Sequence, residues 1–294
     1  MSSFYELKNR INTVKNTGQV TKALKIVAAA KQKKSQTNLK NSRYIRDALQ
    51  KIIAQIRKEL GNAIEKNYLP LLFIPNLESN KVLMVTVMSK RGLCGPLNSK
   101  LFYKILLKKS ELEGKGYHVH FISVNKLAQK FLRNFNEDVI AFFSDISENP
   151  SLDDVSPIIN LVKESYTKYR YVFLCYSDFV KSGIYEQKIN QLLPIDLPEN
   201  SNDNHDKNRN LLYSQYIIEP DPVYVLDQMS NLYVDLEIYE AILSSIASEN
   251  TARMISMSKA TDNIQKLVYQ LTLKLNKERQ ARITKQVAEI SANL

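Results

Sequence analysis

The sequence predicts an α/β fold: a long antiparallel coiled coil of N- and C-terminal helices, together with a central Rossmann-like α/β domain. Three observations predict it. Apolar residues recur every three or four positions at both ends, strand and helix patterns alternate in the middle, and neither Gly nor Pro occurs from Val223 to the end. The expected parts are residues 1–60, 75–218 and 222–294.

The first predicted element is one amphipathic helix of about fifty-five residues that starts near Phe4. Its apolar seam has close to heptad spacing and includes Leu7, Ile11, Val14, Leu39, Leu49, Ile53, Ile56 and Leu60. Gly18 and the polar stretch from residue 31 to 38 interrupt this seam. The pattern leaves two readings open: this stretch contacts something other than its partner helix, or it is simply a solvated face.

The middle of the chain alternates between strand and helix patterns, as in a doubly wound domain. Residues 82–88 form a nearly continuous apolar run, which is typical of a strand buried on both faces. We predict strands at residues 82–88, 117–124, 138–143, 169–176, 184–193 and 211–218, and helices at 97–109, 126–134 and 158–166. Ser156 is the expected cap of the last of these helices, with Pro157 at its first position. Residues 199–210 contain no apolar residue and are expected to form a mobile surface loop.

The last predicted element is a single helix that begins after Glu219-Pro220-Asp221-Pro222, with Asp221 as its cap and Pro222 in its first turn. At about 1.5 Å per residue it would be on the order of 100 Å long. A domain of this size needs no such rod for its own core. The two terminal helices are therefore expected to bury their seams against each other.

Composition excludes several classes of protein. The two cysteines, Cys94 and Cys175, form no CxxC pair, so the sequence indicates neither a zinc site nor a disulfide framework and favours a reducing compartment. No apolar run approaches eighteen residues, and the first residues lack the apolar core of a secretory signal. The helical pattern is already present at Phe4, which leaves no room for a removable presequence.

The positive charge is concentrated at one end. Residues 1–60 contain fourteen basic and three acidic side chains, a net charge of +11 that equals the net charge of the whole chain. Such a concentration implies an acidic partner, which could be a nucleic acid, an anionic membrane surface or an acidic protein.

The most enzyme-like segment is the loop Ser89–Asn98, which joins a buried strand to a helix. It matches neither GxxxxGK[ST] nor GxGxxG, and Pro96 removes an amide donor, so a tight strand-to-helix turn is favoured over a nucleotide site. His118, His120 and His205 have no carboxylate or cysteine partners at useful spacing. We predict no catalytic, cofactor-binding or metal-binding residues.

Three collinear motifs resemble one known family. They are the run INTVKNT with VTKALKIVAAAK in the first helix, RGLCGPLN in the loop, and ASE, ARM, AT, RQA, IT and EI along the last helix. Together they resemble the gamma subunit of F-type ATP synthase, and the resemblance spans the chain with stronger ends than middle. The sequence is identified as a member of that family.

The resemblance implies a rotor rather than a catalyst. In the family the two terminal helices form a shaft inside a ring of three alpha and three beta subunits, and the α/β domain joins the epsilon subunit and the membrane ring of c subunits. Proton flow turns the ring and the shaft, which couples it to ATP synthesis. The resemblance also implies a peripheral location on the cytoplasmic face of the bacterial inner membrane and no cofactor.

The resemblance further implies two sets of contact residues. Arg253, Gln280 and Thr284, with Lys22 and Lys25 on the basic first helix, would face the beta subunits. Tyr216 and Glu219 would face the membrane ring and the epsilon subunit at the foot of the stalk.

The sequence also departs from the family pattern at four positions. Pro96 replaces a Gly, Gly18 a Gln, Gln286 a Glu and Leu24 a Met. Because Gln286 has no charge, the resemblance supports a contact role at this position only weakly. The regulatory cysteine insertion of the chloroplast form is absent, which argues against thiol switching.

Two alternatives from other classes remain at this stage. The chain could be a basic coiled-coil nucleic-acid-binding protein, for which residues 31–40 with Tyr44 are the best stretch, although aromatic residues are sparse there. It could also be a nucleotide-using α/β enzyme with helical arms.

Overall fold

The computed structural model describes residues 2–60, 69–196 and 218–292. Its elements, in chain order, are α1 (Ser2–Leu60), the short 3-10 helix η3 (Leu71–Phe73), β1 (Lys81–Val87), α2 (Leu97–Gly114), β2 (His118–Val124), α3 (Lys126–Asn134), β3 (Val139–Phe143), α4 (Leu152–Tyr166), β4 (Tyr171–Lys181), β5 (Ile184–Leu193) and α5 (Pro222–Ala292). We refer to η3 through β5, with their connections, as the sheet region (residues 71–193). No helix in the described ranges has a stretch that is long and apolar enough to cross a membrane.

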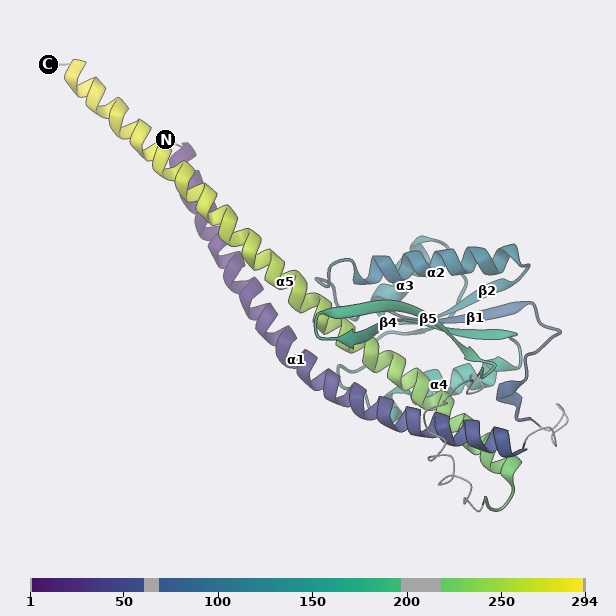
Figure 1. The fold of residues 1–294 in the computed structure, drawn as a ribbon. Helices are drawn as coiled ribbons and strands as arrows, with labels where there is room; N and C mark the ends of the chain where they lie inside the picture. Colours follow the sequence, from purple (N-terminus) through teal and green to yellow (C-terminus); the bar gives the residue numbers. More distant parts are fainter. Residues whose placement is uncertain (1, 61–68, 197–217, 293–294) are drawn as a thin grey trace, which may run out of the picture.

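The two long helices pair antiparallel, as predicted, and project well beyond the sheet region (Figure 1). Near the N-terminus Leu7 and Ile11 pack against Leu271 in one buried cluster. Much further down the same pair of helices, Arg43 bonds to Glu240. Residue numbers on α1 therefore rise as those on α5 fall. The C-terminal end of α5 extends past the start of α1 (Figure 1).

Helix α5 starts where the capping pattern predicts. The Asp221 carboxylate accepts hydrogen bonds from the backbone amides of Val223 and Tyr224, both at 3.0 Å. These amides have no partner within the helix, and Pro222, at the first position, has no amide to satisfy. A carboxylate there also favours the positive end of the helix dipole. With no internal Gly or Pro, the helix then runs for 71 residues.

Within the described residues the sheet has five strands, in the order β3-β2-β1-β4-β5. The first four are parallel, and β5 runs antiparallel to β4. Helices α2 and α3 cover one face, whereas α4 and the coiled coil cover the other, so the doubly wound prediction is confirmed with α5 taking part in the second layer. The predicted strand at 211–218 and the predicted loop at 199–210 lie outside the described residues, apart from Ile218.

The predicted start of α4 is wrong. The helix begins one turn earlier, at Leu152, where Ser151 and Asp154 form a capping box. Pro157 therefore lies inside the helix rather than at its first position. A proline there cannot bond the carbonyl of Asp153, but the Ser156 hydroxyl donates to that carbonyl at 2.9 Å. The Ser-Pro pair looks like a helix start, yet here the serine compensates for the proline.

The polar stretch at residues 31–38 of α1 was expected either to contact something other than the partner helix or to be a solvated face. Neither expectation describes its inward-facing side chains. Gln32 and Ser35 are buried against α5, where Gln32 Nε2 donates to Thr251 Oγ1 at 2.9 Å and Asn250 Nδ2 donates to Ser35 Oγ at 3.5 Å. The seam therefore continues through hydrogen-bonded polar side chains instead of apolar ones. Hydropathy spacing cannot reveal this because both partners are polar.

Candidate functional site

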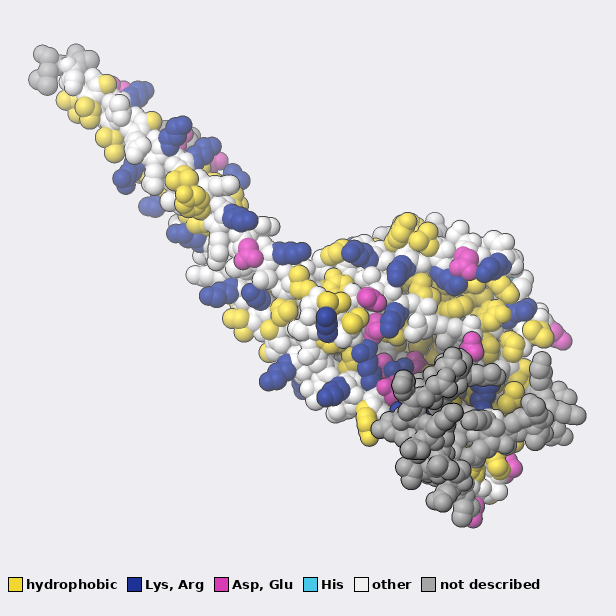
Figure 2. Space-filling view, in the orientation of Figure 1, with side chains coloured by type: hydrophobic (Ala, Val, Ile, Leu, Met, Phe, Trp, Pro, Cys, Tyr) yellow, Lys and Arg dark blue, Asp and Glu magenta, His cyan; other side chains and the backbone are white. Residues whose placement is uncertain are grey.

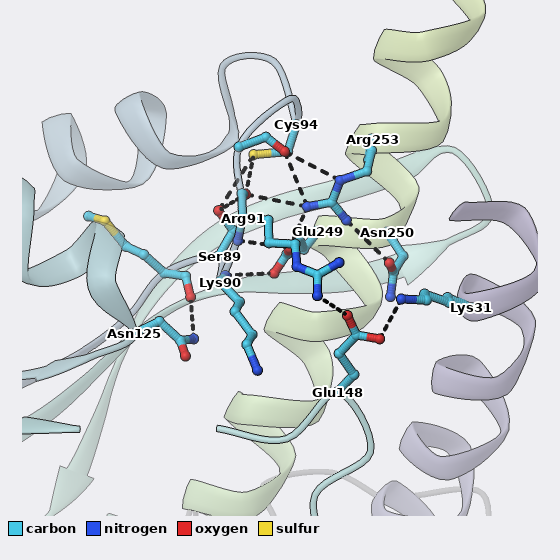
Figure 3. A network of polar contacts seen from close by, with 12 residues as sticks. Lys31, Ser89, Lys90, Arg91, Cys94, Asn125, Glu148, Glu249, Asn250 and Arg253 are labelled. Carbon is cyan, nitrogen blue, oxygen red and sulfur yellow. Dashed lines mark hydrogen bonds and ion pairs between the residues drawn. The ribbon is translucent and has the colours of Figure 1, made fainter. Parts of the chain in front are cut away.

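The loop Ser89–Asn98, called here the junction loop, leaves the end of β1 and packs against α5 (Figure 3). It holds itself in a tight turn: the Ser89 amide donates to Asn98 Oδ1 at 3.1 Å, and Asn98 Nδ2 donates to Ser89 Oγ at 2.6 Å. Leu93 and Gly95 have φ angles of 63° and 59°. The prediction of a tight strand-to-helix turn is confirmed.

Backbone amides and carbonyls of this loop form hydrogen bonds with two side chains of α5. Glu249 accepts from the amides of Lys90 at 2.9 Å and Arg91 at 3.3 Å. Arg253 donates to the carbonyls of Arg91 at 3.3 Å and Gly92 at 3.2 Å. The carboxylate of Glu249 thus takes the place that an anionic ligand would occupy in a phosphate-binding loop.

A third charged residue links the junction loop to α1. Glu148, in the segment between β3 and α4, pairs with Lys31 of α1 through one oxygen and with Arg91 through the other (Figure 3). The hydrogen bond from Lys31 lowers the pKa of the Glu148 carboxyl below its ordinary value. Both long helices are therefore connected to the same loop.

A small cavity of about 30 Å³ lies between the end of the sheet and α5. Two buried polar atoms on its wall, Asn125 Oδ1 and Ser245 Oγ, have no hydrogen-bond partner within the protein. The volume suits one or two water molecules, which could bond to both atoms.

Lower on the coiled coil, part of the positive charge of α1 is neutralised within the chain. Arg43 bonds to Asp178 of β4 and to Glu240 of α5, and Arg46 pairs with Glu237 and Glu240. Burial raises the pKa of Glu240, although both arginines act against this shift. Internal carboxylates thus meet some of the basic residues of α1, and the prediction of an acidic partner concerns those that stay exposed, such as Lys22.

The remaining predicted contact residues are distributed along the shaft. Lys22 and Lys25 are exposed on α1, and Lys25 Nζ donates to Ser258 Oγ at 3.0 Å. Basic side chains dominate the visible face of the upper shaft (Figure 2). Gln280 and Thr284 are exposed on the final part of α5, where every described side chain from residue 276 to 291 is exposed.

The foot of the stalk is described only in part. Glu219 is exposed just before α5, whereas Tyr216 lies outside the described residues. The predicted residues that the structure describes thus form no single cluster, and among them only Arg253 belongs to a dense polar network.

Glu249 and Glu148 were missed as functional candidates. Glu249 stands four residues before Arg253, a spacing that places both on one face of a helix, and this signal could have been used. Glu148 lies in an irregular segment and pairs with residues distant in sequence. No local pattern could have identified it.

His120 and both cysteines lie in the described ranges. No group of three or more potential ligand side chains occurs there. His120 instead contacts Tyr169 through Nδ1 at 2.8 Å and Asp138 through Nε2 at 3.4 Å. Both cysteines are buried, and burial raises the pKa of the Cys175 thiol.

Comparison with known proteins places this architecture in one family. The family model described as ATP synthase matches residues 3–293. The ATP synthase gamma chain of Xylella fastidiosa (strain M12) is 32% identical over 292 residues, which cover 99% of this chain and 98% of the relative. The ATP synthase gamma chain of Stenotrophomonas maltophilia (strain K279a) has the same identity and coverage.

Solved structures share the fold at lower sequence identity. A chain from the Euglena gracilis mitochondrial ATP synthase has a TM-score of 0.66 and 17% identity, covering 99% of this chain and 93% of its own length. A chain from the Tetrahymena thermophila mitochondrial ATP synthase central stalk and c-ring has a TM-score of 0.60 and 24% identity, covering 82% of this chain and 99% of its own. On the family model and the bacterial relatives together, the chain belongs to the ATP synthase gamma chain family.

Proposed function

We propose that this chain is the central-stalk gamma subunit of a proton-translocating F-type ATP synthase. In this role it transmits rotation of the membrane ring to the catalytic beta subunits and so couples proton flow to ATP synthesis. The observation that carries the proposal is the long projecting shaft, with its exposed end, in a member of the gamma chain family. The chain itself is a non-catalytic part of the complex.

The mechanism rests on the asymmetry of the shaft. Above the sheet region, the paired part of α5 has α1 on one side and exposed residues on its other sides. Its final part, past the start of α1, presents different exposed residues on each face, so neighbours arranged around the shaft meet different surfaces. A subunit that binds these surfaces unequally is held in a different state of nucleotide affinity at each angle of rotation. This is coupling through differential contact free energy, and it needs no reacting group on the shaft.

The proposed partners are three alpha and three beta subunits around the shaft, the epsilon subunit and the membrane ring of c subunits. Residues 1–60 and 222–294 would form the shaft, and residues 75–218 the part outside the alpha and beta ring. Glu219 and Tyr216 are the proposed contacts at the foot. The complex would lie at the cytoplasmic face of the bacterial inner membrane, with this chain as a peripheral subunit.

Five residues are proposed to face the beta subunits. Four are exposed and can make direct polar contacts, namely Lys22, Lys25, Gln280 and Thr284. Arg253 differs because its side chain is only 14% exposed and its guanidinium bonds to the junction loop. We therefore propose that Arg253 contributes from the edge of the interface, together with the loop that it holds.

Reconstitution tests the proposal. Alpha and beta subunits assembled with this chain should show rotation-coupled ATPase activity that is absent without it. The Gln280→Ala variant should assemble with a stability change within about 0.5 kcal/mol, because its side chain is exposed, yet lower coupled turnover severalfold. Gln129→Ala, at a half-buried glutamine on α3 away from the coiled coil, is the control and should leave turnover unchanged once its folding is verified.

Failure of the chain to join the ring, or unchanged ATP turnover when it does, would overturn the proposal. Salt-resistant binding of single-stranded DNA would favour the nucleic-acid alternative instead, which neither the family model nor the bacterial relatives support. Saturable nucleotide binding by this chain alone would favour the enzyme alternative.

A further inference from the structure

We propose that Glu249 and Arg253 are positioning residues that clamp the junction loop onto α5, and that this clamp is one joint through which the sheet region turns the shaft. The inference rests on the proposed rotor function. It assigns to these two residues a role within the chain, separate from any contact with the catalytic subunits.

The clamp binds both kinds of backbone group in the loop. Glu249 Oε2 and Oε1 accept from the amides of Lys90 and Arg91, while Arg253 donates to the carbonyls of Arg91 and Gly92. Glu249 and Arg253 also pair with each other one helical turn apart (Figure 3). Because donors and acceptors are matched in both directions, the loop can neither rotate nor withdraw without breaking charge-assisted hydrogen bonds.

Both side chains are shielded from water. The side chain of Glu249 is 10% exposed and that of Arg253 is 14% exposed. In such surroundings ionic hydrogen bonds are strong, and a charge that loses its partner is costly. The contact is therefore stiffer than a pairing between exposed side chains.

The loop is well placed to transmit force. It follows directly after β1, the central strand of the five, so displacement of the sheet reaches the loop through its most buried strand. Gly95 in the loop lies so close to α5 that a Cβ atom there would be 2.8 Å from Ser256 Oγ. Beyond this level the coiled coil projects away from the sheet region (Figure 1).

A second connection extends the clamp to α1. Glu148 joins Lys31 of α1 to Arg91 of the loop, so the same loop is tied to both helices of the shaft (Figure 3). These two side chains are more exposed than Glu249, at 38% each for Lys31 and Glu148. Glu148 therefore adds to the clamp, and Glu249 is its centre.

The first test compares Glu249→Gln with Glu113→Gln in the assembled complex. Glu113 also pairs with a basic residue four positions away, Lys109, but on α2 and away from the shaft. Glu249→Gln should speed hydrogen exchange at the Lys90 and Arg91 amides by at least about tenfold, because these amides lose their ionic acceptor. It should also reduce the number of protons pumped per ATP hydrolysed, while ATP turnover itself continues. Glu113→Gln should change neither quantity.

A second variant guards against misfolding. Arg253→Lys keeps a cation beside Glu249 but lacks the planar guanidinium that reaches two carbonyls, so it should fold normally and pump protons at an intermediate ratio. Assembly of each variant is checked before pumping is measured.

A disulfide that replaces the lost connection between the junction loop and α5 distinguishes force transmission from a purely structural role. Cys94 of the loop packs in one buried cluster with Ala252 of α5, so Ala252→Cys places a second thiol beside it. In the Glu249→Gln background, oxidation of Cys94 and the introduced thiol to a disulfide, verified by mass, should restore the pumping ratio, and reduction should abolish it again.

Outcomes for the clamp and for the rotor are distinguishable. If the wild-type chain assembles and pumps, but Glu249→Gln pumps as well as Glu113→Gln, the clamp is wrong and the rotor stands. Loss of pumping that the verified disulfide does not restore also overturns the clamp. If the wild-type chain itself neither assembles nor couples, the rotor proposal fails first.

Discussion

The lower and upper parts of α5 belong to one uninterrupted helix but have opposite environments. From Ala241 to Ala252 all described side chains are buried except the half-buried Ile246. From residue 276 to 291 every described side chain is exposed. The first segment lies between α1 and the sheet, and the second projects beyond both (Figure 1).

Composition explains the difference. The buried segment is rich in Ala, Ser and Thr, whose small side chains let α1 and β4 approach closely from two sides. Two of the hydroxyls bond to β4 within this narrow space: Ser244 Oγ donates to Asp178 and accepts from the Phe179 amide at 2.8 Å, and Ser248 Oγ donates to the Ser177 carbonyl at 3.0 Å. The exposed segment instead consists largely of Lys, Arg, Gln and Glu with scattered Ile and Val.

This comparison separates stability from function along a single helix. Tertiary packing supplies most of the stability of a helix in a protein, so the buried segment anchors α5 to the rest of the chain. The projecting segment adds little to stability, and its exposed Ile283, Val287 and Ile290 remain available to partners. Substitutions in the two segments should therefore have different consequences.

The largest expected effect comes from enlarging a small residue in each segment. Ala247 is completely buried, against Leu39 of α1 and Phe179 of β4, so Ala247→Leu should cost about 3 kcal/mol of unfolding free energy through overpacking. The matched Ala288→Leu, on the exposed segment, should change stability by less than about 0.5 kcal/mol. Denaturant unfolding of both variants measures this, and equal losses would contradict the division.

A second, smaller effect concerns the charged cluster of the lower coiled coil. Glu240→Gln should change stability by less than about 0.5 kcal/mol at acid pH, because the wild-type carboxyl is then neutral and the amide oxygen of Gln can accept from Arg43 in its place. Because burial raises the pKa of Glu240 in the folded chain, the folded state binds its proton more tightly than the unfolded state does. The stability contributed in this way is present below the ordinary pKa of 4.5 and is lost as the pH rises through the raised pKa.

Wild type should therefore lose stability relative to Glu240→Gln as the pH rises from about 4 towards neutrality. Denaturant unfolding of both proteins over this pH range measures the change. The other titrating groups are the same in both proteins, so their contributions cancel in the difference between the two free energies of unfolding. A gain in the stability of wild type relative to Glu240→Gln as the pH rises would mean that the arginines outweigh burial. Glu111→Gln, at an exposed ion pair on α2, serves as the control.

The smallest effect tests how closely the upper helices approach. A Cβ atom at Gly18 would lie 2.9 Å from Ile264 Cγ2, and a β-branched side chain cannot easily move away. Gly18→Ala should therefore give no net gain in the wild-type background, although alanine has the higher helix propensity. With Ile264→Ala present, the same change should stabilise by about 1 kcal/mol. A gain of equal size in both backgrounds would mean that the helices have room to separate.

Much of the fold could be predicted because each prediction depended on local pattern. The apolar run at 82–88 and the capping residue Asp221 carry their structural signal within a few residues, and both were confirmed. The start of α4 was mispredicted because Ser156-Pro157 can be a cap or an internal compensated proline, and only the capping box at Ser151 decides between them. The seam at Gln32 was misread since polar pairing leaves no mark in hydropathy.

The candidate site was less predictable. The resemblance directed attention to Arg253, whose role in holding the junction loop depends on tertiary contacts with residues more than 150 positions away. Glu148 and Lys31, separated by 117 positions, could be paired only once the sheet and helices were in place. Exposed residues such as Gln280 make no contact that would distinguish them within this chain, so they stay predictions.

The polar pairs between α1 and α5 differ from one level of the coiled coil to the next, and they also determine how far α5 projects. A slip of one heptad would preserve the apolar spacing but move α5 along α1 by about 10 Å. It would place Arg43 opposite Ala247 or Tyr233 instead of Glu240, and it would separate Gln32 from Thr251. Because these partners do not repeat along the seam, every copy of the chain holds its tip at the same distance from the sheet region, and the proposed ring of subunits would meet the same residues in every copy.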